Sequence, residues 1–502
     1  MTHPFTLRRC LLLCLPALLV GGWLRVEMLN GWRGGLYFGP DSGSYWESVF
    51  RFAQDGHFNV GGKRPWLYPV VVWLASHGPV SPAFSVALVQ QSAAWLSIAV
   101  LGALVRAVLP WGKWFVVPIT VLYAVQPEIL YWGHVLIADS LFISITLTVA
   151  LAVALYWQRP VWSLLAVAVT LIFLAMALRP VGRALWLSLI PIALLVPHMG
   201  WRPNLLHAAA LTLLYFPASK ATSVTQGTDL LFASTLPLMR LDTPLHADLK
   251  AELRPQVESA RADLWHYITV GQREVWGELV DDDPADRGAV LQKLRTERKR
   301  FLQVRRDIIR ESLRHSPFTY AEMVAMKIFH VWSLGDAHER LDPSRWLATD
   351  QKFLGTATQK IDSKFPAFVL GNPKIADTET LHDALAKTIA AGGSQTRVLR
   401  ALNLFGSATR PDRWWWIVPA ALGVCVFPWT RNGHRLVPVL LLAAGYLGMT
   451  FVVGRAVGRY RLPVEFAVYV CAAAGLAVLW KVSSSQWSVI SRRAPRRSDS
   501  AY

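Results

Sequence analysis

Long apolar runs, separated by short polar or basic junctions, dominate the sequence. A helix needs roughly 17 to 25 mostly apolar residues to cross about 30 Å of hydrocarbon, and several runs have this length. The predicted spans lie at residues 10–28, 84–108, 114–131, 137–157, 162–178, 181–197, 203–219, 413–430, 435–453 and 463–481. We therefore predict an all-α polytopic membrane protein with about ten transmembrane helices.

A hydrophilic stretch at residues 220–412 interrupts this pattern and holds most of the acidic residues. It separates an N-terminal module, 1–219, from a C-terminal module, 413–481. The N-terminal module has about seven spans and a first outer loop at 30–83, and the C-terminal module has about three. Residues 482–502 form a basic tail.

The hydrophilic stretch carries its own helix signals. Ser316 can cap a helix that begins at Pro317 and continues with an apolar stripe. The basic segment before it places Phe301, Val304 and Ile308 on one side of a helix. We predict a mainly helical outer domain close to the membrane.

Composition agrees with the span pattern. Hydrophobic residues make up 53% of the 502-residue chain and charged residues 17%, whereas soluble domains carry about 25% charged residues. Trp23 and Arg25 directly follow the first apolar run, which has no small-x-small cleavage site, so we interpret it as a retained span rather than a signal peptide. All four cysteines lie in apolar runs and indicate neither a disulfide framework nor a metal site: Cys10, Cys14, Cys425 and Cys471.

Basic junctions set the expected orientation. If Arg8 and Arg9 face the cytoplasm, the other inward junctions are also basic, among them Arg159 and Arg202. Both termini are then cytoplasmic, and the first outer loop and the outer domain lie on the opposite face. The chain has no N-x-[ST] sequon and is rich in Arg and Trp, which favours a bacterial inner membrane.

Several cations break this charge rule because they lie at outward-facing junctions. Such a cation costs free energy unless it pairs with an acid or reaches the lipid headgroups, and guanidinium groups bind phosphate oxygens well. A bound anionic group at the outer surface would account for all of them together. They are Lys63, Arg64, Arg179, Arg183, Arg455, Arg459 and Arg461.

Acids collect at the same face. Asp41 and Asp55 lie in the first outer loop, Glu128 follows the third span, and Asp139 opens the fourth, with His134 between them. A carboxylate can take the proton of an attacking hydroxyl while cations stabilise a departing phosphate. Asp139 can instead be a helix N-terminal acid, and Glu128 an interfacial one.

Common catalytic motifs are missing from the sequence. It contains no G-x-x-x-x-G-K-[ST], no strand-borne G-x-G-x-x-G, no H-E-x-x-H and no G-x-S-x-G. We therefore expect neither a nucleotide-binding enzyme nor a zinc protease or serine hydrolase, and no nucleic-acid partner.

The first outer loop resembles that of the GT-C superfamily of membrane glycosyltransferases, in particular the dolichyl-phosphate-mannose protein mannosyltransferase and aminoarabinose-transferase-like branch. In "PDSGSYWESVFRFAQDGHFNVGGKRPWLYP", an Asp precedes a Ser-x-x-Tyr-like stretch, a "DG-F" and an "R-P-x-x-YP". The segments "PEILYWGHVLIADSLF", "RHSPFTYAEMVAMKIFHVW" and "RYRLPVEFAVYV" are similar to later parts of that family, although Asp139 stands where Glu is commoner.

The resemblance implies ten or more transmembrane helices, outer-loop helices lying on the membrane and a sugar donor carried on a polyprenyl phosphate. Membrane lipids surround the chain, and the acceptor is a glycan, a lipid or a protein. By transfer, Asp41 is the catalytic base, and Asp139 and Glu128 are further candidate catalytic residues. Some members use a divalent metal ion, so that cofactor stays open. The implied donor phosphate-binding residues are Arg64, Lys63, Arg179, Arg459 and Arg461, and the implied acceptor or sugar-binding residues are Tyr45, Tyr68 and His134.

Two other functions remain open. A carrier or flippase for a lipid-linked or anionic substrate would show two similar halves with charge buried at mid-membrane. An O-antigen ligase or polymerase would share the substrate class and the large outer loop, with its essential residues in that loop.

Overall fold

The computed structural model describes most of the chain. It covers residues 7–31, 38, 41–56, 64–109, 113–197, 199–222, 227–272, 298–333, 361–370, 402, 413–426, 433–453 and 461–493. All regular secondary structure in these residues is helical, and they contain no β-strand. The predicted all-α class is thereby confirmed for the described part of the chain.

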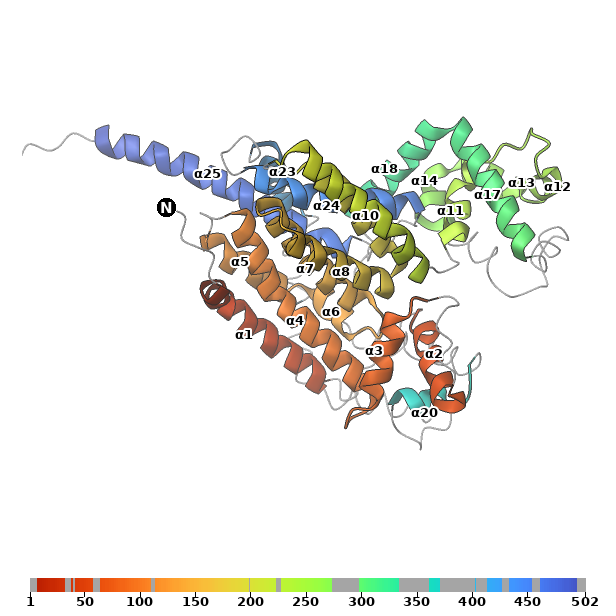
Figure 1. Ribbon diagram of the computed structural model, residues 1–502, viewed down its shortest axis with the longest axis horizontal. Helices are drawn as coiled ribbons and strands as arrows, with labels where there is room; N and C mark the ends of the chain where they lie inside the picture. Colours follow the sequence, from red (N-terminus) through yellow and green to blue (C-terminus); the bar gives the residue numbers. More distant parts are fainter. Residues whose placement is uncertain are drawn as a thin grey trace, which may run out of the picture.

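The N-terminal module packs as a bundle, in which α4 contacts α1 and α7, and α7 contacts α8 (Figure 1). Its helices are α1 (Leu7–Gly31), α2 (Ser42–Asp55), α3 (Leu67–Ser76), α4 (Pro82–Val108), α5 (Lys113–Ala124), α6 (Pro127–His134), α7 (Asp139–Gln158), α8 (Trp162–Leu178), α9 (Arg183–Leu194) and α10 (Trp201–Ala221).

The outer domain gathers at one end of the molecule, beyond the end of α24 (Figure 1). Its described helices are α11 (Gly227–Thr235), α12 (Ala247–Glu252), α13 (Arg254–Ala262), α14 (Leu264–His266), α17 (Arg298–His315) and α18 (Pro317–Ser333). The short α20 (Phe365–Leu370) lies against α2 instead. The C-terminal module consists of α23 (Trp414–Val426), α24 (Val437–Val453) and α25 (Glu465–Arg493).

Five helical segments in the described part of the chain are long and apolar enough to cross a membrane, or six if α5 and α6 count as one bent span. Further apolar helices, including 162–178 and 180–194, are shorter than 18 residues. The membrane protein class therefore has support, while the number of ten spans stays a prediction. The five segments are Arg8–Leu29, Pro82–Val108, Asp139–Gln158, Gly433–Val452 and Leu462–Lys481.

The predicted span over 114–131 is divided into two helices. The helix α5 ends at Ala124 and α6 begins at Pro127, with an angle of 50° between the two. Pro127 has no backbone N–H to donate, and it forces the preceding residue out of the helical region. Gln126 accordingly has ψ 118°. The bend places Glu128 and His134 on a separate short helix.

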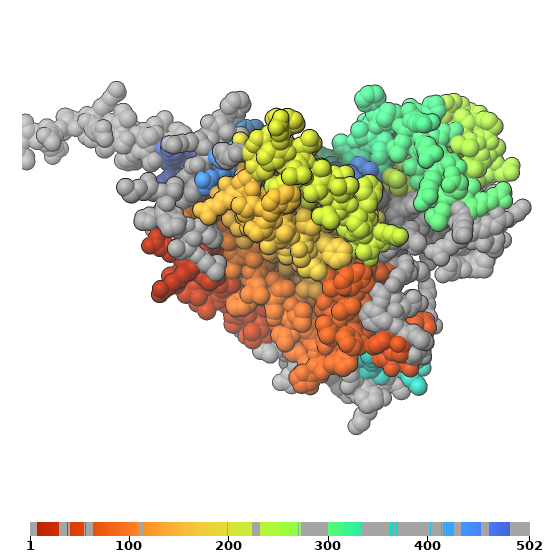
Figure 2. Space-filling model, in the orientation of Figure 1, coloured from red at the N-terminus to blue at the C-terminus, as the bar shows by residue number. Residues whose placement is uncertain are grey.

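Apolar side chains cover much of the outer surface of the bundle. Leu19 on α1 is 65% exposed, and Phe216 on α10 is 67% exposed. The helix α10, yellow in Figure 2, lies on the outer surface of the molecule in this view. Exposed apolar area costs about 25 cal/mol per Å² in water, so these faces favour contact with lipid.

Close backbone contact joins α23 to α25. A Cβ added at Gly423 would overlap the Cys471 carbonyl, and one added at Gly475 would overlap the Pro419 carbonyl. Small residues allow membrane helices to approach this closely. The two glycines therefore set the distance between these helices.

Both helix predictions in the outer domain are confirmed. The helix α18 begins at Pro317, where the Tyr320 amide donates to the Ser316 carbonyl at 3.1 Å. Phe301, Val304 and Ile308 are buried on one side of α17. They join a core that also includes Phe232, Met239 and Leu249: the α11 to α13 region packs against that side.

Lys327 lies at the junction between the outer domain and α24. Its Nζ donates to Ser234 Oγ at 3.2 Å and to the Phe451 carbonyl at 3.3 Å, and the side chain is buried. The Tyr320 hydroxyl donates to the Val452 carbonyl nearby. These contacts attach α18 to the end of α24.

Burial lowers the pKa of Lys327 from 10.5 to about 7, so the unfolded chain binds more protons than the folded chain between those two pH values. We expect the stability of this junction to rise with pH across that window. Lys327→Met should flatten the rise, whereas the exposed Lys364→Met should keep it. Melting temperatures of purified protein at several pH values measure this, and the same slope in Lys327→Met would contradict it.

Candidate functional site

Three acids predicted as catalytic, Asp41, Glu128 and Asp139, each form an ion pair with an arginine predicted to bind phosphate. Each acid stands at or near the start of a helix, namely α2, α6 and α7. The resulting pairs differ strongly in exposure. Asp41 is the most exposed of the three acids, and Asp139 is the least exposed.

Asp41 and Arg64 form the most exposed of the three pairs. Arg64 Nη2 lies 2.5 Å from Asp41 Oδ1, and the two side chains are 19% and 24% exposed for arginine and aspartate. Arg64 Nε donates to Ser44 Oγ at 2.7 Å, and Ser44 in turn donates to the Asp41 carbonyl at 2.8 Å. Ser44 therefore helps to hold the arginine against the acid.

Asp41 is the N-cap residue of α2, yet its side chain makes no cap hydrogen bond. An aspartate in this position commonly accepts from the second or third amide of the helix. Here the carboxylate turns to Arg64 instead. The local turn chemistry alone would not require that choice.

A polar connection runs from this pair into the bundle. The Arg64 guanidinium lies 4.9 Å from the centre of the Tyr45 ring, which packs edge-on against Tyr68 at 5.0 Å. The Tyr68 hydroxyl donates to Gln90 Oε1 at 2.7 Å. Gln90 Nε2 then donates to the Val135 carbonyl at 2.7 Å, just before α7. Tyr45 and Tyr68 are buried, so a sugar-binding role for them stays a prediction.

Asp139 and Arg179 form a buried pair where α7 begins and α8 ends. Their side chains are 5% and 9% exposed. Arg179 is the C-cap residue of α8, and η1 (Pro180–Gly182) follows it. Removal of either partner would leave an uncompensated buried charge, so the pair links these two helix ends.

Glu128 shares Arg461 with a second acid, Glu465. Arg461 Nη2 donates to both Glu128 oxygens at 3.0 and 3.1 Å, and Arg461 Nε donates to Glu465 Oε1 at 2.6 Å. Gln126 Nε2 donates to the other Glu465 oxygen at 2.7 Å, and Tyr469 donates to Gln126 Oε1 at 3.2 Å. Arg461 and Glu465 are only 2% exposed.

Arg461 also connects the outer domain to this cluster. Its Nη1 donates to the Val331 carbonyl near the end of α18 at 3.0 Å. One side chain thereby joins α6, α18 and the start of α25. With its donors directed at these groups, a phosphate-binding role for Arg461 stays a prediction.

The remaining predicted residues are placed in different ways. His134 is fully buried at the end of α6. Arg183 donates to the carbonyls of Ser219 and Thr222 at 3.1 and 3.3 Å, at the end of α10. Lys63 and Arg459 lie outside the described residues.

Sequence reasoning missed Gln90, Gln126 and Glu465. Gln90 and Gln91 are adjacent amides inside an otherwise apolar span, a costly arrangement that could have drawn attention to them. Glu465 lies four residues after Arg461, the spacing that places two side chains on one helical face. No such signal marks Gln126, whose partner is 339 positions away.

Metal binding receives no support from this arrangement. Among the residues that the structure describes, no group of three or more His, Cys, Asp or Glu side chains is placed to hold a metal ion. The acids described above each face an arginine, whereas a divalent cation needs several oxygen ligands converging on one point. The acids that face these arginines therefore do not fit such an ion.

No family model, curated protein or solved structure matches this chain.

Proposed function

We propose that this protein is an integral membrane glycosyltransferase. It moves a sugar from a polyprenyl-phosphate carrier to a glycan, lipid or protein acceptor on the periplasmic face of a bacterial inner membrane, with both termini in the cytoplasm. The observation that carries the proposal is the partly exposed Asp41–Arg64 pair at the start of α2, in the loop that resembles GT-C enzymes.

Exposure favours Asp41 as the base. Its side chain is 24% exposed, against 13% for Glu128, 5% for Asp139 and 2% for Glu465. An ionised carboxylate can accept a proton from a bound hydroxyl. The other three acids would first have to give up buried partners.

The proposed reaction is a single displacement. The acceptor hydroxyl attacks the anomeric carbon of the donor sugar as its proton passes to Asp41. The bond between that carbon and the phosphate oxygen breaks, and the polyprenyl phosphate leaves with the electron pair. Attack opposite the leaving group inverts the anomeric configuration.

Arg64 has two roles in this proposal. A guanidinium has five N–H donors in a planar fork, so one side chain can bond a carboxylate and a phosphate oxygen together. Its charge would stabilise the departing phosphate. Ser44 and Tyr45 already hold the Arg64 side chain in place, so less conformational entropy is lost when it binds an anion.

A buried cation supports carrier function as a second candidate. Arg25 on α1 is 3% exposed, and its described hydrogen bonds go to the carbonyls of Gly21 and Ala94. Charged side chains inside a span commonly mark substrate or ion paths. Under this alternative, Arg25 would bind the anionic part of a transported lipid.

Reconstitution separates the two functions. Purified protein in liposomes would receive polyprenyl-phosphate sugar labelled in the sugar, together with periplasmic glycan, lipid and peptide acceptors. We expect the label on an acceptor with inverted configuration, and none from a nucleotide sugar. Movement of the labelled lipid between leaflets without transfer would favour the carrier instead. If neither transfer nor movement is seen with any acceptor, the proposed glycosyltransferase function is rejected.

A further inference from the structure

A cavity in the outer domain lies apart from the three ion pairs. Its volume is about 670 Å³, within the range of roughly 300 to 1,000 Å³ typical of small-molecule sites. It lies between the η2 turn (Leu236–Leu238), α13 and the corner where α17 meets α18. The lining residues are Pro237, Leu238, Arg240, Leu241, Asp242, Arg254, Glu258, Arg261, His315, Ser316 and Thr319.

The lining carries excess positive charge. Three arginines face two carboxylates, so the cavity is cationic even with His315 neutral. The hydrogen bond from Arg240 lowers the pKa of Asp242 to about 2, and Asp242 therefore stays ionised at neutral pH. The hydroxyls of Ser316 and Thr319 add hydrogen-bonding groups beside the apolar Pro237 and Leu238. Together these are the groups that bind a sugar ring carrying an anionic substituent.

One arginine is fixed and two are available. Arg261 Nε and Nη2 donate to the carbonyls of Pro237 and Met239 at 2.9 and 2.6 Å, which hold its charge at the cavity. Arg240 pairs with Asp242, and Arg254 pairs with Glu258 at 3.4 Å. Both pairs are largely exposed, and such pairs contribute little stability. An anionic ligand can therefore take over these two guanidiniums at small cost.

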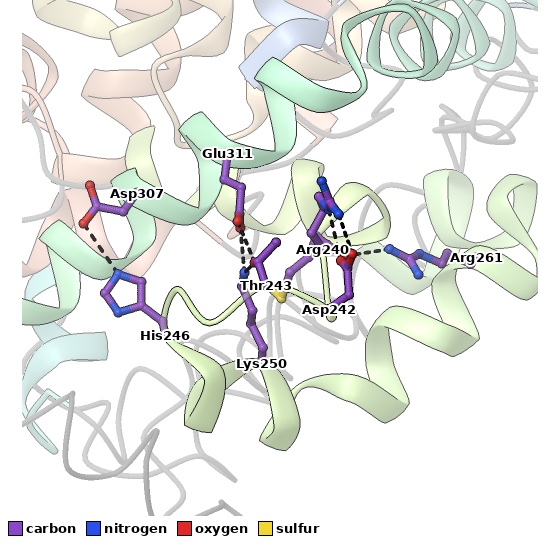
Figure 3. A network of polar contacts seen from close by, with 9 residues as sticks. Arg240, Asp242, Thr243, His246, Lys250, Arg261, Asp307 and Glu311 are labelled. Atoms are coloured by element: carbon purple, nitrogen blue, oxygen red, sulfur yellow. Dashed lines mark hydrogen bonds and ion pairs between the residues drawn. The ribbon is translucent and has the colours of Figure 1, made fainter.

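The wall that carries Arg240 and Asp242 is anchored to α17. Figure 3 shows the segment from Arg240 to His246 passing beside Glu311 and Asp307 of that helix. Lys250, 1% exposed, lies 2.6 Å from Glu311 Oε2, and Thr243 donates to Glu311 Oε1 at 2.6 Å. His246 Nε2 lies 3.5 Å from Asp307 Oδ2. This wall is thus held to α17 by contacts of Thr243, His246 and Lys250.

The helix α18 connects the cavity to the ion pairs. Ser316 and Thr319 line the cavity at its start, and Val331 accepts from Arg461 near its end. At 1.5 Å per residue, the two places are roughly 22 Å apart along the helix. A ligand that reaches from the cavity to the Arg461 cluster must therefore be an extended chain.

We propose that this cavity binds an acidic sugar unit, carrying a carboxylate or a phosphate, within an extended glycan acceptor. The acceptor role rests on the proposed glycosyltransferase function, but the binding itself does not. The arginines of the cavity bind the anionic group, and Ser316 and Thr319 bind hydroxyls of the ring. Specificity for the acceptor thus resides in the outer domain, away from Asp41.

Direct binding tests this assignment without any transfer reaction. Calorimetry on the purified full-length protein would use three probes: a glucuronic acid disaccharide, glucose 1-phosphate and a neutral glucose disaccharide. We expect at least one anionic probe to bind tenfold or more tightly than the neutral disaccharide. The preferred probe then distinguishes a carboxylate from a phosphate as the recognised group.

Two matched variants locate the site. Arg254→Gln should weaken binding of the preferred anionic probe about tenfold, because it removes one charge-assisted contact. Arg310→Gln changes an exposed arginine of α17 that does not line the cavity, and should leave binding unchanged. Equal binding of charged and neutral probes, or equal effects of the two variants, would overturn the assignment. Binding with no transfer in liposomes would keep the site and reject only its role as an acceptor site.

Discussion

Asp41→Asn is expected to lower the rate of sugar transfer by about 10² to 10⁴-fold, because an amide cannot accept the proton of the attacking hydroxyl. The change preserves the shape of the side chain and removes only a partly exposed ion pair, which typically contributes up to about 1 kcal/mol. The loss should therefore lie in turnover rather than in folding. Initial rates with the labelled polyprenyl-phosphate sugar, together with a melting curve, measure the two effects separately.

Glu47→Gln is the matched control for this prediction. Glu47 lies on the same helix, and its side chain is 38% exposed in an i,i+4 pair with Arg51. The Glu47→Gln change removes one negative charge a few residues from Asp41 and leaves Arg64 unchanged. Transfer should remain within about twofold of the unchanged protein, since single exposed pairs have small effects. Full activity in Asp41→Asn, or equal losses in both variants, would rule out Asp41 as the base.

Arg461→Met is expected to destabilise the fold by about 3 to 5 kcal/mol, the usual cost of leaving buried charges without their partner. Glu128 and Glu465 would both lose hydrogen bonds from the guanidinium, and Val331 would lose a donor to its carbonyl. The contact between α18 and the start of α25 should weaken as well. Unfolding of the purified protein in mixed detergent, followed by tryptophan fluorescence, measures the loss.

A triple variant that removes every charge of this cluster provides the control. In Glu128→Gln/Arg461→Met/Glu465→Gln no buried carboxylate remains unpaired, so most of the lost stability should return. Such a recovery would assign the cost to uncompensated charge rather than to the missing side chain. An Arg461→Met protein within about 1 kcal/mol of the original would show that these acids find other partners, and would contradict the cluster described above.

Local pattern was sufficient for the helical elements. The start of α18 at Pro317 and the buried side of α17 both depend on neighbouring residues, because a proline lacks an amide hydrogen and apolar spacing sets the buried side. The bend within the predicted span 114–131 has a related cause. A mean hydropathy over the span does not register Pro127, whereas the backbone bends at this proline.

Pairing between distant residues had no such local basis. The sequence marked Asp41, Arg64, Asp139 and Arg179 as unusual, since charge at a membrane junction is costly in any fold. It could not indicate which arginine faces which acid. Asp139 and Arg179 are separated by 40 positions and Glu128 and Arg461 by 333, distances along the chain that only packing brings together.

Apolar run lengths thus indicate from the sequence a helical membrane protein, and the chemistry of single residues marks its acids and arginines at the span junctions as unusual. Which acid is exposed enough to meet a substrate depends on the packing of helices far apart in the chain. In the folded protein Asp139, Glu128 and Glu465 are enclosed with their arginines, while Asp41 stays partly in contact with solvent. Burial is a property of the assembled helices, because desolvation depends on every neighbour around a group and not on its position in the chain.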